Sequence, residues 1–378
     1  MAALLAVIRG FSRKESQTVD NFWVDITRFT LYVLVLLSIV LTLLMVSQGA
    51  VQNFAPNHVV QGILLPSGPA SSQFAISLLG SNGGGFFGAN AAALFHNPTG
   101  LSNLCESVAI VLLPAAMVVM FGQMVGRRQA MVIYAVMLGL LVLAVIGTTL
   151  SALWNTLSTA VSNGSVNASL DSFTPLGGLI PMLLMQLGEI VFGGVGSGLY
   201  GMLSFVLLTV FISGLMVGRT PEYLGKKIAA YDMKMVALAI LLPPVLTLVS
   251  TGIAVSWPGI RSSLTNTRAH GFSEILYGFS SMGNNNGSSF AGFNGDQLMV
   301  NVVGTVLMGC TRFVPLLAMV YLGANLAKKK QMAISSGTLR TDIGLFAVLL
   351  LVIILLIGRL NFVPALILGP IADFLTAR

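Results

Sequence analysis

The sequence predicts an all-α polytopic membrane protein, built from repeated units of an apolar span, a short re-entrant helix, a glycine stretch and a second span. Apolar residues make up 55% of the 378 residues and charged residues only 8%, and the mean hydropathy is +0.90. Apolar runs of about 20 residues, long enough to cross a bilayer, recur along the chain. Uncharged glycine stretches interrupt them, and irregular backbone of that kind is excluded from contact with lipid.

The apolar runs give the order of the elements. Residues 1–25 predict a cytoplasmic lead-in rather than a signal peptide, because the first span begins too late and no small-residue cleavage site precedes it. Eight runs approach the length of a span. They cover residues 26–46, 101–125, 131–150, 175–190, 199–217, 235–255, 298–322 and 343–366.

Basic clusters indicate how these spans are oriented. Residues 47–100 contain no Asp, Glu, Lys or Arg, whereas basic residues at 127–128, 219, 226–227 and 328–330 follow later runs. By the positive-inside rule the loops 218–233 and 324–342 are cytoplasmic, and the glycine stretches face the opposite side. These lysines and arginines are therefore typical of loops that contact the bilayer and set the orientation of the spans. No basic face or recognition motif predicts nucleic-acid binding.

Three glycine stretches define three repeats. They are SNGGGFFGAN (residues 81–90), SNGSVN (162–167) and NNNGSS (284–289), and each follows a short amphipathic segment, at 70–79, 151–161 and 272–282. We therefore expect channel-like repeats at residues 26–126, 129–217 and 234–323, followed by a C-terminal transmembrane helix at 343–378. In the second repeat, GGVGSGLYG (193–201) separates two short apolar runs, which predicts a helix broken near the middle of 175–217.

The glycine stretches are suited to holding an ion with neutral oxygen atoms. Carbonyl dipoles replace the water shell of an ion, and glycine adopts the backbone conformations that turn them inward. The lack of carboxylates disfavours Ca²⁺ and Mg²⁺, and the lack of Lys and Arg disfavours an anion. A partly dehydrated monovalent cation remains, with side-chain oxygens of Ser81, Asn82, Asn90, Asn163, Asn285 and Asn286 as further ligands. The alternative is that these are tight turns between helices.

Two charged residues lie within apolar runs. Glu189 precedes the predicted helix break, and a charge at that depth is expensive unless it faces water or a partner. It is a candidate for ion binding or gating, with a helix-capping role as the alternative. Arg312 is a candidate fixed charge below the filter, and Arg219 fits an orientation anchor.

Other motifs carry little weight. Gly196, Gly198 and Gly201 satisfy G-x-G-x-x-G, but no strand precedes them, so dinucleotide binding is excluded. Both cysteines fall in apolar runs and predict packing rather than a disulfide. The three histidines are scattered, without the helical spacing of a metal site, and are expected to be ordinary polar residues of the outer loops.

Longer strings resemble the potassium-binding subunit of the Kdp-type ATP-driven potassium pump, which is related to potassium channels and to Trk/Ktr-type transporters. The resemblance extends over essentially the whole chain. It is carried by GFSRKESQTVDNFWVDITR (10–28), SNGGGFFGANAA (81–92), SNGSVNASLDSFTPLGG (162–178), GEIVFGGVGSGLYGM (188–202), GRTPEYLGKKI (218–228), HGFSEILY (270–277), NNNGSSFAG (284–292) and SSGTLRTD (335–342).

The resemblance implies a function. The chain would hold extracellular or periplasmic K⁺ in a filter and deliver it to a P-type ATPase catalytic subunit, within a high-affinity uptake complex that also contains small accessory subunits, in a bacterial-type plasma (inner) membrane. The partner would bind ATP, because this chain has neither a Walker A loop nor an Asp-Lys-Thr-Gly string, and no organic cofactor is expected. The filter glycines would be Gly83, Gly164 and Gly287. The gating region would include Gly193, Gly194, Gly196, Gly198, Glu189, Arg219 and Arg312.

The resemblance also predicts a departure. Members of the family have four repeats around one pore, and this chain is expected to lack the first of them. The segment before the second filter glycine, residues 150–162, is expected to be shortened. Two alternatives stay open: a passive potassium channel or secondary transporter subunit, and a truncated, non-conducting remnant.

Overall fold

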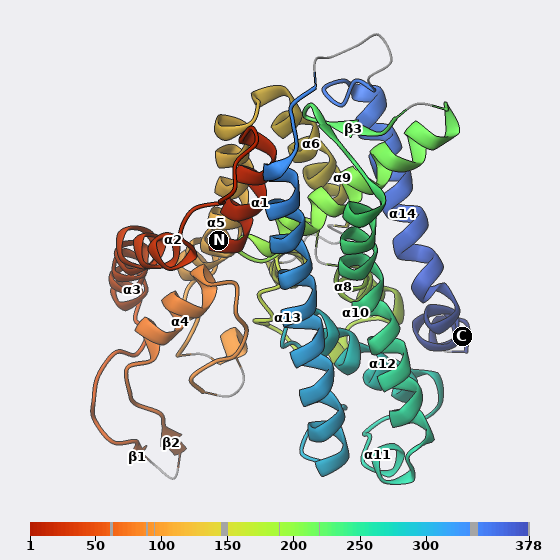
Figure 1. Cartoon of the computed structure of the whole chain (residues 1–378). Helices are drawn as coiled ribbons and strands as arrows, with labels where there is room; N and C mark the ends of the chain where they lie inside the picture. Colours follow the sequence, from red (N-terminus) through yellow and green to blue (C-terminus); the bar gives the residue numbers. More distant parts are fainter. Residues whose placement is uncertain are drawn as a thin grey trace.

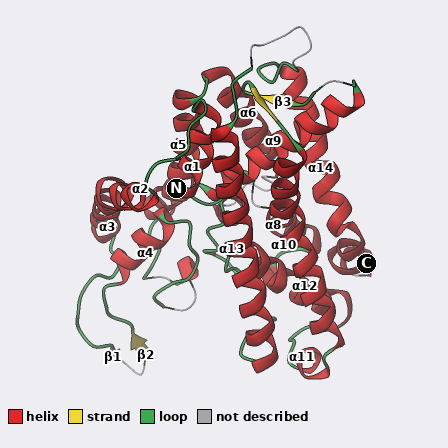
Figure 2. Cartoon of the chain, in the orientation of Figure 1, coloured by secondary structure: helices red, strands yellow, loops and turns green. Residues whose placement is uncertain are grey.

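The computed structural model describes residues 1–60, 63–87, 90–93, 95–144, 150–188, 190–218, 220–332 and 339–376. Long helices stand side by side in a bundle, and α10 and α13 run along much of its length (Figure 1). Helices supply nearly all the regular structure drawn in Figure 2, as the hydropathy pattern predicts. The predicted fold class is confirmed.

Short and long helices alternate along the chain. In chain order the elements are α1 (Ala2–Ser12), α2 (Phe22–Phe29), η1 (Thr30–Leu34), α3 (Val35–Ser47), β1 (His58–Val60), β2 (Ile63–Leu65), α4 (Ala70–Leu79), η2 (Asn90–Ala92), α5 (Gly100–Met124), α6 (Arg127–Ala144), α7 (Leu150–Ala160), η3 (Leu170–Ser172), α8 (Pro175–Gln186), α9 (Ser197–Met216), β3 (Glu222–Tyr223), β4 (Lys226–Lys227), α10 (Ala230–Ser256), α11 (Pro258–Ser262), α12 (Arg268–Asn284), α13 (Leu298–Lys328), α14 (Gly344–Leu366), η4 (Ile367–Ile371) and α15 (Ala372–Thr376). The strands form two antiparallel hairpins, β1–β2 and β3–β4.

Six helical segments in the described part of the chain are long and apolar enough to cross a membrane. A seventh candidate, from Gly344 to Thr376, is bent by 47°. The continuous run of α2, η1 and α3 is the least buried of the six, and it lies at the side of the bundle (Figure 1). Many of its large apolar side chains are exposed. The other five are Gly100–Met124, Arg127–Ala144, Ser197–Met216, Ala230–Ser256 and Leu298–Lys328.

The basic loops gather at one end of the bundle. The Nζ atom of Lys226 donates to the main-chain oxygen of Lys329 at 2.7 Å, which joins the β3–β4 hairpin to the end of α13. An ion pair of 3.7 Å between Arg128 and Asp342 joins the start of α6 to the segment before α14. The hairpin β1–β2 and helix α11 lie at the opposite end (Figure 1). Loops at one end of a bundle are the arrangement that the positive-inside rule requires of loops on one side of a membrane.

The N-terminal helix is an internal element rather than a loosely attached lead-in. Nearly every side chain of α1 is buried, and its Gly10 packs directly on Gly323 of α13. The absence of side chains at both positions lets the two backbones touch. Helix α1 is therefore part of the core that supports α13.

Two histidines differ from their sequence expectation, because His270 lies on helix α12 rather than in an outer loop and His96 is enclosed. His96 is 1% exposed, its ring stacks on Phe74 with centroids 3.3 Å apart, and its Nε2 lies 3.5 Å from a carboxylate oxygen of Glu106. The expectation of an ordinary outer-loop residue is wrong for His96, because α4 and α5 enclose it. Both cysteines are free thiols, as predicted.

A buried carboxylate joins the two helices that pack most extensively, α10 and α13. Asp232 is fully buried. It accepts hydrogen bonds from the main-chain nitrogen of Ala229 at 2.7 Å and from Nδ2 of Asn325 at 2.7 Å, and it pairs with Lys329. One side chain thus caps α10 and ties it to the end of α13.

We predict that Asp232→Ala lowers the free energy of unfolding by about 3 kcal/mol, because it leaves the Lys329 ammonium and the Asn325 amide without their partner. Thermal unfolding of the purified protein in detergent measures the change. The control is Glu15→Gln, which breaks an exposed ion pair with Lys330 and leaves the midpoint unchanged. Equal midpoints for both variants would show that Asp232 does not hold α10 to α13.

Candidate functional site

Three short helices, α4, α7 and α12, end in the same backbone motif. The residue that follows each helix or its last turn adopts the left-handed conformation, with φ of +51° at Ser81, +59° at Ser162 and +56° at Asn285. The next main-chain N–H then bonds to the carbonyl five residues earlier. These bonds join Asn82 to Ser77 (2.9 Å), Asn163 to Ser158 (2.8 Å) and Asn286 to Ser281 (2.9 Å). A Schellman-type cap thus ends each of the three helices, and each glycine stretch begins at an equivalent point after its cap.

We define the first, second and third glycine loops as residues 81–87, 161–167 and 285–289. In the second and third loops the asparagine side chain holds the turn. The Oδ1 atom of Asn163 accepts from the main chain and the hydroxyl of Ser165, and Oδ1 of Asn286 accepts from both groups of Ser288. These oxygens are therefore occupied within their own loops.

The same asparagines join each loop to the preceding one. Nδ2 of Asn163 donates to the carbonyl of Ser77 at 3.3 Å, and Nδ2 of Asn286 donates to the carbonyl of Ser158 at 3.5 Å. Ser77 and Ser158 hold the same place in the caps of α4 and α7. The second loop thus contacts the cap before the first loop in the same way as the third contacts the cap before the second. The repeats seen in the sequence therefore also make repeated contacts.

The three predicted filter glycines meet. A Cβ atom at Gly83 would lie 2.9 Å from Cα of Gly164, and one at Gly287 would lie 3.9 Å from Cα of Gly83. A Cβ atom at Gly164 would overlap the main-chain oxygen of Asn286, and Gly164 also has φ of +81°. In the first loop, the left-handed backbone falls at Gly84 rather than Gly83. Gly83 is therefore needed for close approach and Gly84 for conformation.

Electrostatics at this junction favour a cation. Each of the three helices points its C-terminal end at its glycine loop, and such an end carries roughly half a negative charge from unpaired carbonyls. The loops themselves contain no ionisable side chain. Any attraction at the loops would therefore come from dipoles alone, an arrangement suited to a monovalent cation rather than to the strong binding of a carboxylate cage.

The broken helix lies next to the loops. Helix α8 ends at Gln186 and α9 begins at Ser197. The break predicted at 193–201 therefore lies earlier in the chain, and Gly198 belongs to the first turn of α9. A Cβ atom at Gly198 would overlap the main chain of Phe192, so this glycine lets the linker cross the start of the helix. Gly193 and Gly196 have φ of +61° and +97°, while Gly194 packs against Ser197 and Ser162.

A cavity of about 130 Å³ is lined by parts of this linker and by parts of the second and third loops. Ser162, Asn284 and Asn285 contribute to its wall, as do the two ends of the break. Arg312 lines this cavity and also a surface pocket of about 360 Å³ that includes Gly287. Of the predicted site residues that the structure describes, Gly198, Asn285 and Arg312 line the cavity, and Asn285, Gly287 and Arg312 line the surface pocket.

Comparison with known proteins identifies the family. The profile described as "Potassium-transporting ATPase A subunit" matches residues 1–148 and 144–375. The chain belongs to this family. The match divides at residues 144–148, just before α7.

Curated relatives agree with that assignment. Three proteins named potassium-transporting ATPase potassium-binding subunit illustrate the range. The protein of Listeria monocytogenes serotype 4a is 53% identical over 412 residues, which cover 100% of this chain and 73% of the relative. Those of Clostridium perfringens and Sorangium cellulosum are 47% and 46% identical over 428 residues, covering 99% of this chain and 74% of each relative. The resemblance stated from the sequence is confirmed.

The other predicted site residues either make contacts of their own or lie outside the described residues. Oγ of Ser81 is buried without a hydrogen-bond partner among the described residues, which leaves an oxygen lone pair for a ligand. Nδ2 of Asn82 bonds to Gly80, and Nδ2 of Asn285 bonds to Thr311. Glu189, Arg219 and the side chain of Asn90 lie outside the described residues.

The structure adds residues that the sequence did not single out. Trp154 and Tyr277 each precede the cap serine of their helix by four positions. The indole N–H of Trp154 donates to the carbonyl of Ser165 at 3.2 Å, and the Tyr277 hydroxyl bonds to that of Ser288 at 2.8 Å. Both aromatic side chains are fully buried and fasten their loops from behind. The available sequence signal was that each aromatic residue lies four positions before the cap serine of its helix.

Gln186 was also missed. It lines the cavity, its Nε2 donates to Ser280 at 3.1 Å, and its Oε1 is buried without a partner among the described residues. A buried amide oxygen without a partner is costly, and a cation passing through the cavity would satisfy it. An isolated polar residue at the end of an apolar run was the only sequence signal.

We predict that Gly164→Ala destabilises the junction by roughly 3 kcal/mol, because it forces a Cβ atom into the Asn286 carbonyl and strains a left-handed backbone. Hydrogen exchange at the three loops and the thermal midpoint measure the effect. Gly309→Ala is the matched control, since a Cβ atom there meets nothing within 4 Å in helix α13. An unchanged midpoint and unchanged exchange in Gly164→Ala would contradict the close packing.

Proposed function

We propose that this chain is the potassium-binding and translocating subunit of a high-affinity ATP-driven potassium uptake complex in a bacterial-type plasma membrane. The convergence of Gly83, Gly164 and Gly287 supports this proposal most directly. Main-chain oxygens of the three glycine loops would hold the partly dehydrated ion, with Ser81 as a candidate side-chain ligand. The names of the relatives support potassium as the transported ion.

The cavity suggests the next step of the route. An ion that leaves the loops would enter the space bounded by Gln186, the α8–α9 linker and Arg312. The amide oxygen of Gln186 would coordinate it, and the guanidinium of Arg312 would raise the energy of a second cation and favour release of the first. Glu189, at the linker, and Arg219 are proposed to act in gating and coupling.

The energy source belongs to a partner in this proposal. A P-type ATPase catalytic subunit would bind and hydrolyse ATP and receive the ion, and small accessory subunits would complete the complex. The word ATPase in the names of the relatives, together with the lack of nucleotide motifs in this chain, supports that division of labour.

Potassium binding is tested by thermal unfolding of the purified protein at constant ionic strength, with K⁺ exchanged for Na⁺. A ligand that binds the folded state alone raises the midpoint in proportion to the logarithm of its concentration above Kd. We expect K⁺ but not Na⁺ to raise it. Gly287→Asp is expected to abolish the difference, because it places a charge and a side chain at a left-handed position in the junction.

The matched control is Gly100→Asp, which adds the same charge at an open position where α5 begins and keeps the response to K⁺. A Gly287→Asp protein that still distinguishes K⁺ from Na⁺ would refute the assignment of the filter. Potassium flux through the reconstituted chain alone, without ATP or a partner, would favour a passive channel instead.

The proposed role of Gln186 predicts a separation of binding from transport. Gln186→Leu keeps nearly the same volume but removes the amide, so uptake by the reconstituted complex is expected to fall about tenfold while the K⁺-dependent midpoint shift persists. Gln123→Leu, at an exposed site, is the control. Normal uptake by Gln186→Leu would exclude the cavity amide from the route.

A further inference from the structure

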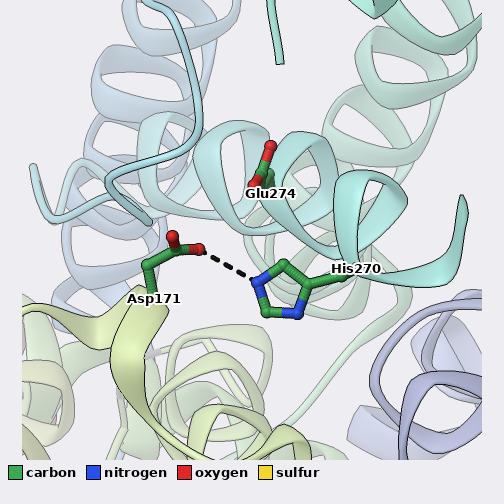
Figure 3. A group of neighbouring side chains, drawn as sticks. All are labelled: Asp171, His270 and Glu274. Atoms are coloured by element: carbon green, nitrogen blue, oxygen red, sulfur yellow. Dashed lines mark hydrogen bonds and ion pairs between the residues drawn. The ribbon is translucent and has the colours of Figure 1, made fainter. Parts of the chain in front are cut away.

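A second group of chemically distinctive side chains lies outside the glycine loops and the cavity. Asp171 comes from the turn η3, His270 and Glu274 come from α12, and Asp373 comes from α15. His270 and Glu274 are four residues apart on one helix and therefore share a face, and Figure 3 shows Asp171 approaching the imidazole from another segment. One potential ligand atom from each of Asp171, His270 and Glu274 lies within 4.8 Å of the other two.

The spacing suits a small metal ion. Nε2 of His270 lies 3.0 Å from Oδ1 of Asp171. Ligand atoms around a tetrahedral zinc ion, with bonds of about 2.0 Å, are about 3.3 Å apart. The carboxylate of Glu274 offers the third potential ligand atom, and water would supply the remaining position.

Glu274 provides an independent indication. Its side chain is fully buried, and Oε1 accepts from Nδ2 of Asn266 at 2.7 Å. Oε2 is buried without a hydrogen-bond partner among the described residues. Because an unpaired buried carboxylate oxygen is expensive, this atom is better explained if a cation binds beside it.

Asp373 completes the arrangement from the other side of the ring. Its Oδ2 lies 2.8 Å from Nδ1 of His270. A carboxylate that accepts the Nδ1 proton leaves the Nε2 lone pair directed at the ligand site, which is the usual outer partner of a metal-binding histidine. No lysine or arginine in the described ranges forms an ion pair with the carboxylate of Asp171, Glu274 or Asp373.

We propose that Asp171, His270 and Glu274 bind a divalent ion of the zinc class, with Asp373 as a positioning residue. One imidazole nitrogen and two carboxylates favour zinc or a neighbouring transition metal over Ca²⁺, which takes six to eight oxygens. Side-chain exposures of about one fifth at His270 and Asp171 leave a path from solvent. The ion would clamp the turn that follows the second loop to the helix that precedes the third.

The experiment is zinc titration of the purified full chain by calorimetry, with Zn²⁺ alone as the probe. We expect one saturable site per chain. His270→Gln should weaken it at least thirtyfold and Asp373→Asn tenfold or more, whereas His58→Gln, which removes an exposed histidine, should leave it unchanged. Equal affinity in His270→Gln, or no saturable site, would overturn the proposal and leave a protonated histidine that bridges two carboxylates.

Zinc-edge X-ray absorption of the unaltered protein gives a test that needs no variant. One imidazole and otherwise oxygen ligands at about 2.0 Å are expected. A sulfur ligand would indicate binding at the free cysteines, and a shell of oxygens alone would indicate surface binding. Either result would refute the site, without bearing on potassium binding at the glycine loops.

Discussion

The structure depends on main-chain contact between three helix ends. Asn163 and Asn286 each reach back to a carbonyl in the cap of the preceding short helix, and the glycines beside them let the backbones touch. A side chain at Gly164 would separate the loops, and loss of either asparagine amide would uncouple neighbouring repeats. Stability and the candidate ion site thus rest on the same few atoms.

The surrounding elements follow from that junction. Trp154 and Tyr277 hydrogen-bond to the second and third loops from α7 and α12, and a small cavity lies at the break between α8 and α9. A continuous helix there would fill the cavity, and its backbone groups would hydrogen-bond to one another within the helix. The interruption leaves the amide of Gln186 beside the cavity, and irregular chain of this kind is tolerated at membrane depth where it lines a cavity.

Much of the fold and part of the candidate site were predictable from local patterns in the sequence. Hydropathy predicts the spans, the basic clusters predict that 127–128, 226–227 and 328–330 share one end, and the glycine stretches predict where the short helices end. Burial of α1 was not predictable, because its contact through Gly10 and Gly323 depends on a partner more than 300 residues away. The offset of the helix break, the enclosure of His96 and the grouping of Asp171 with His270 likewise depend on tertiary packing. Sequence periodicity carries no information about such distant partners.

The direction of the asparagine contacts has a consequence for biogenesis. The Nδ2 amides of Asn163 and Asn286 each donate to a carbonyl that lies earlier in the chain. During synthesis from the N-terminus, the acceptor for every new loop has therefore already left the ribosome when its donor emerges. This order allows each of these two loops to dock by its asparagine amide as it emerges, without waiting for a later segment of the chain.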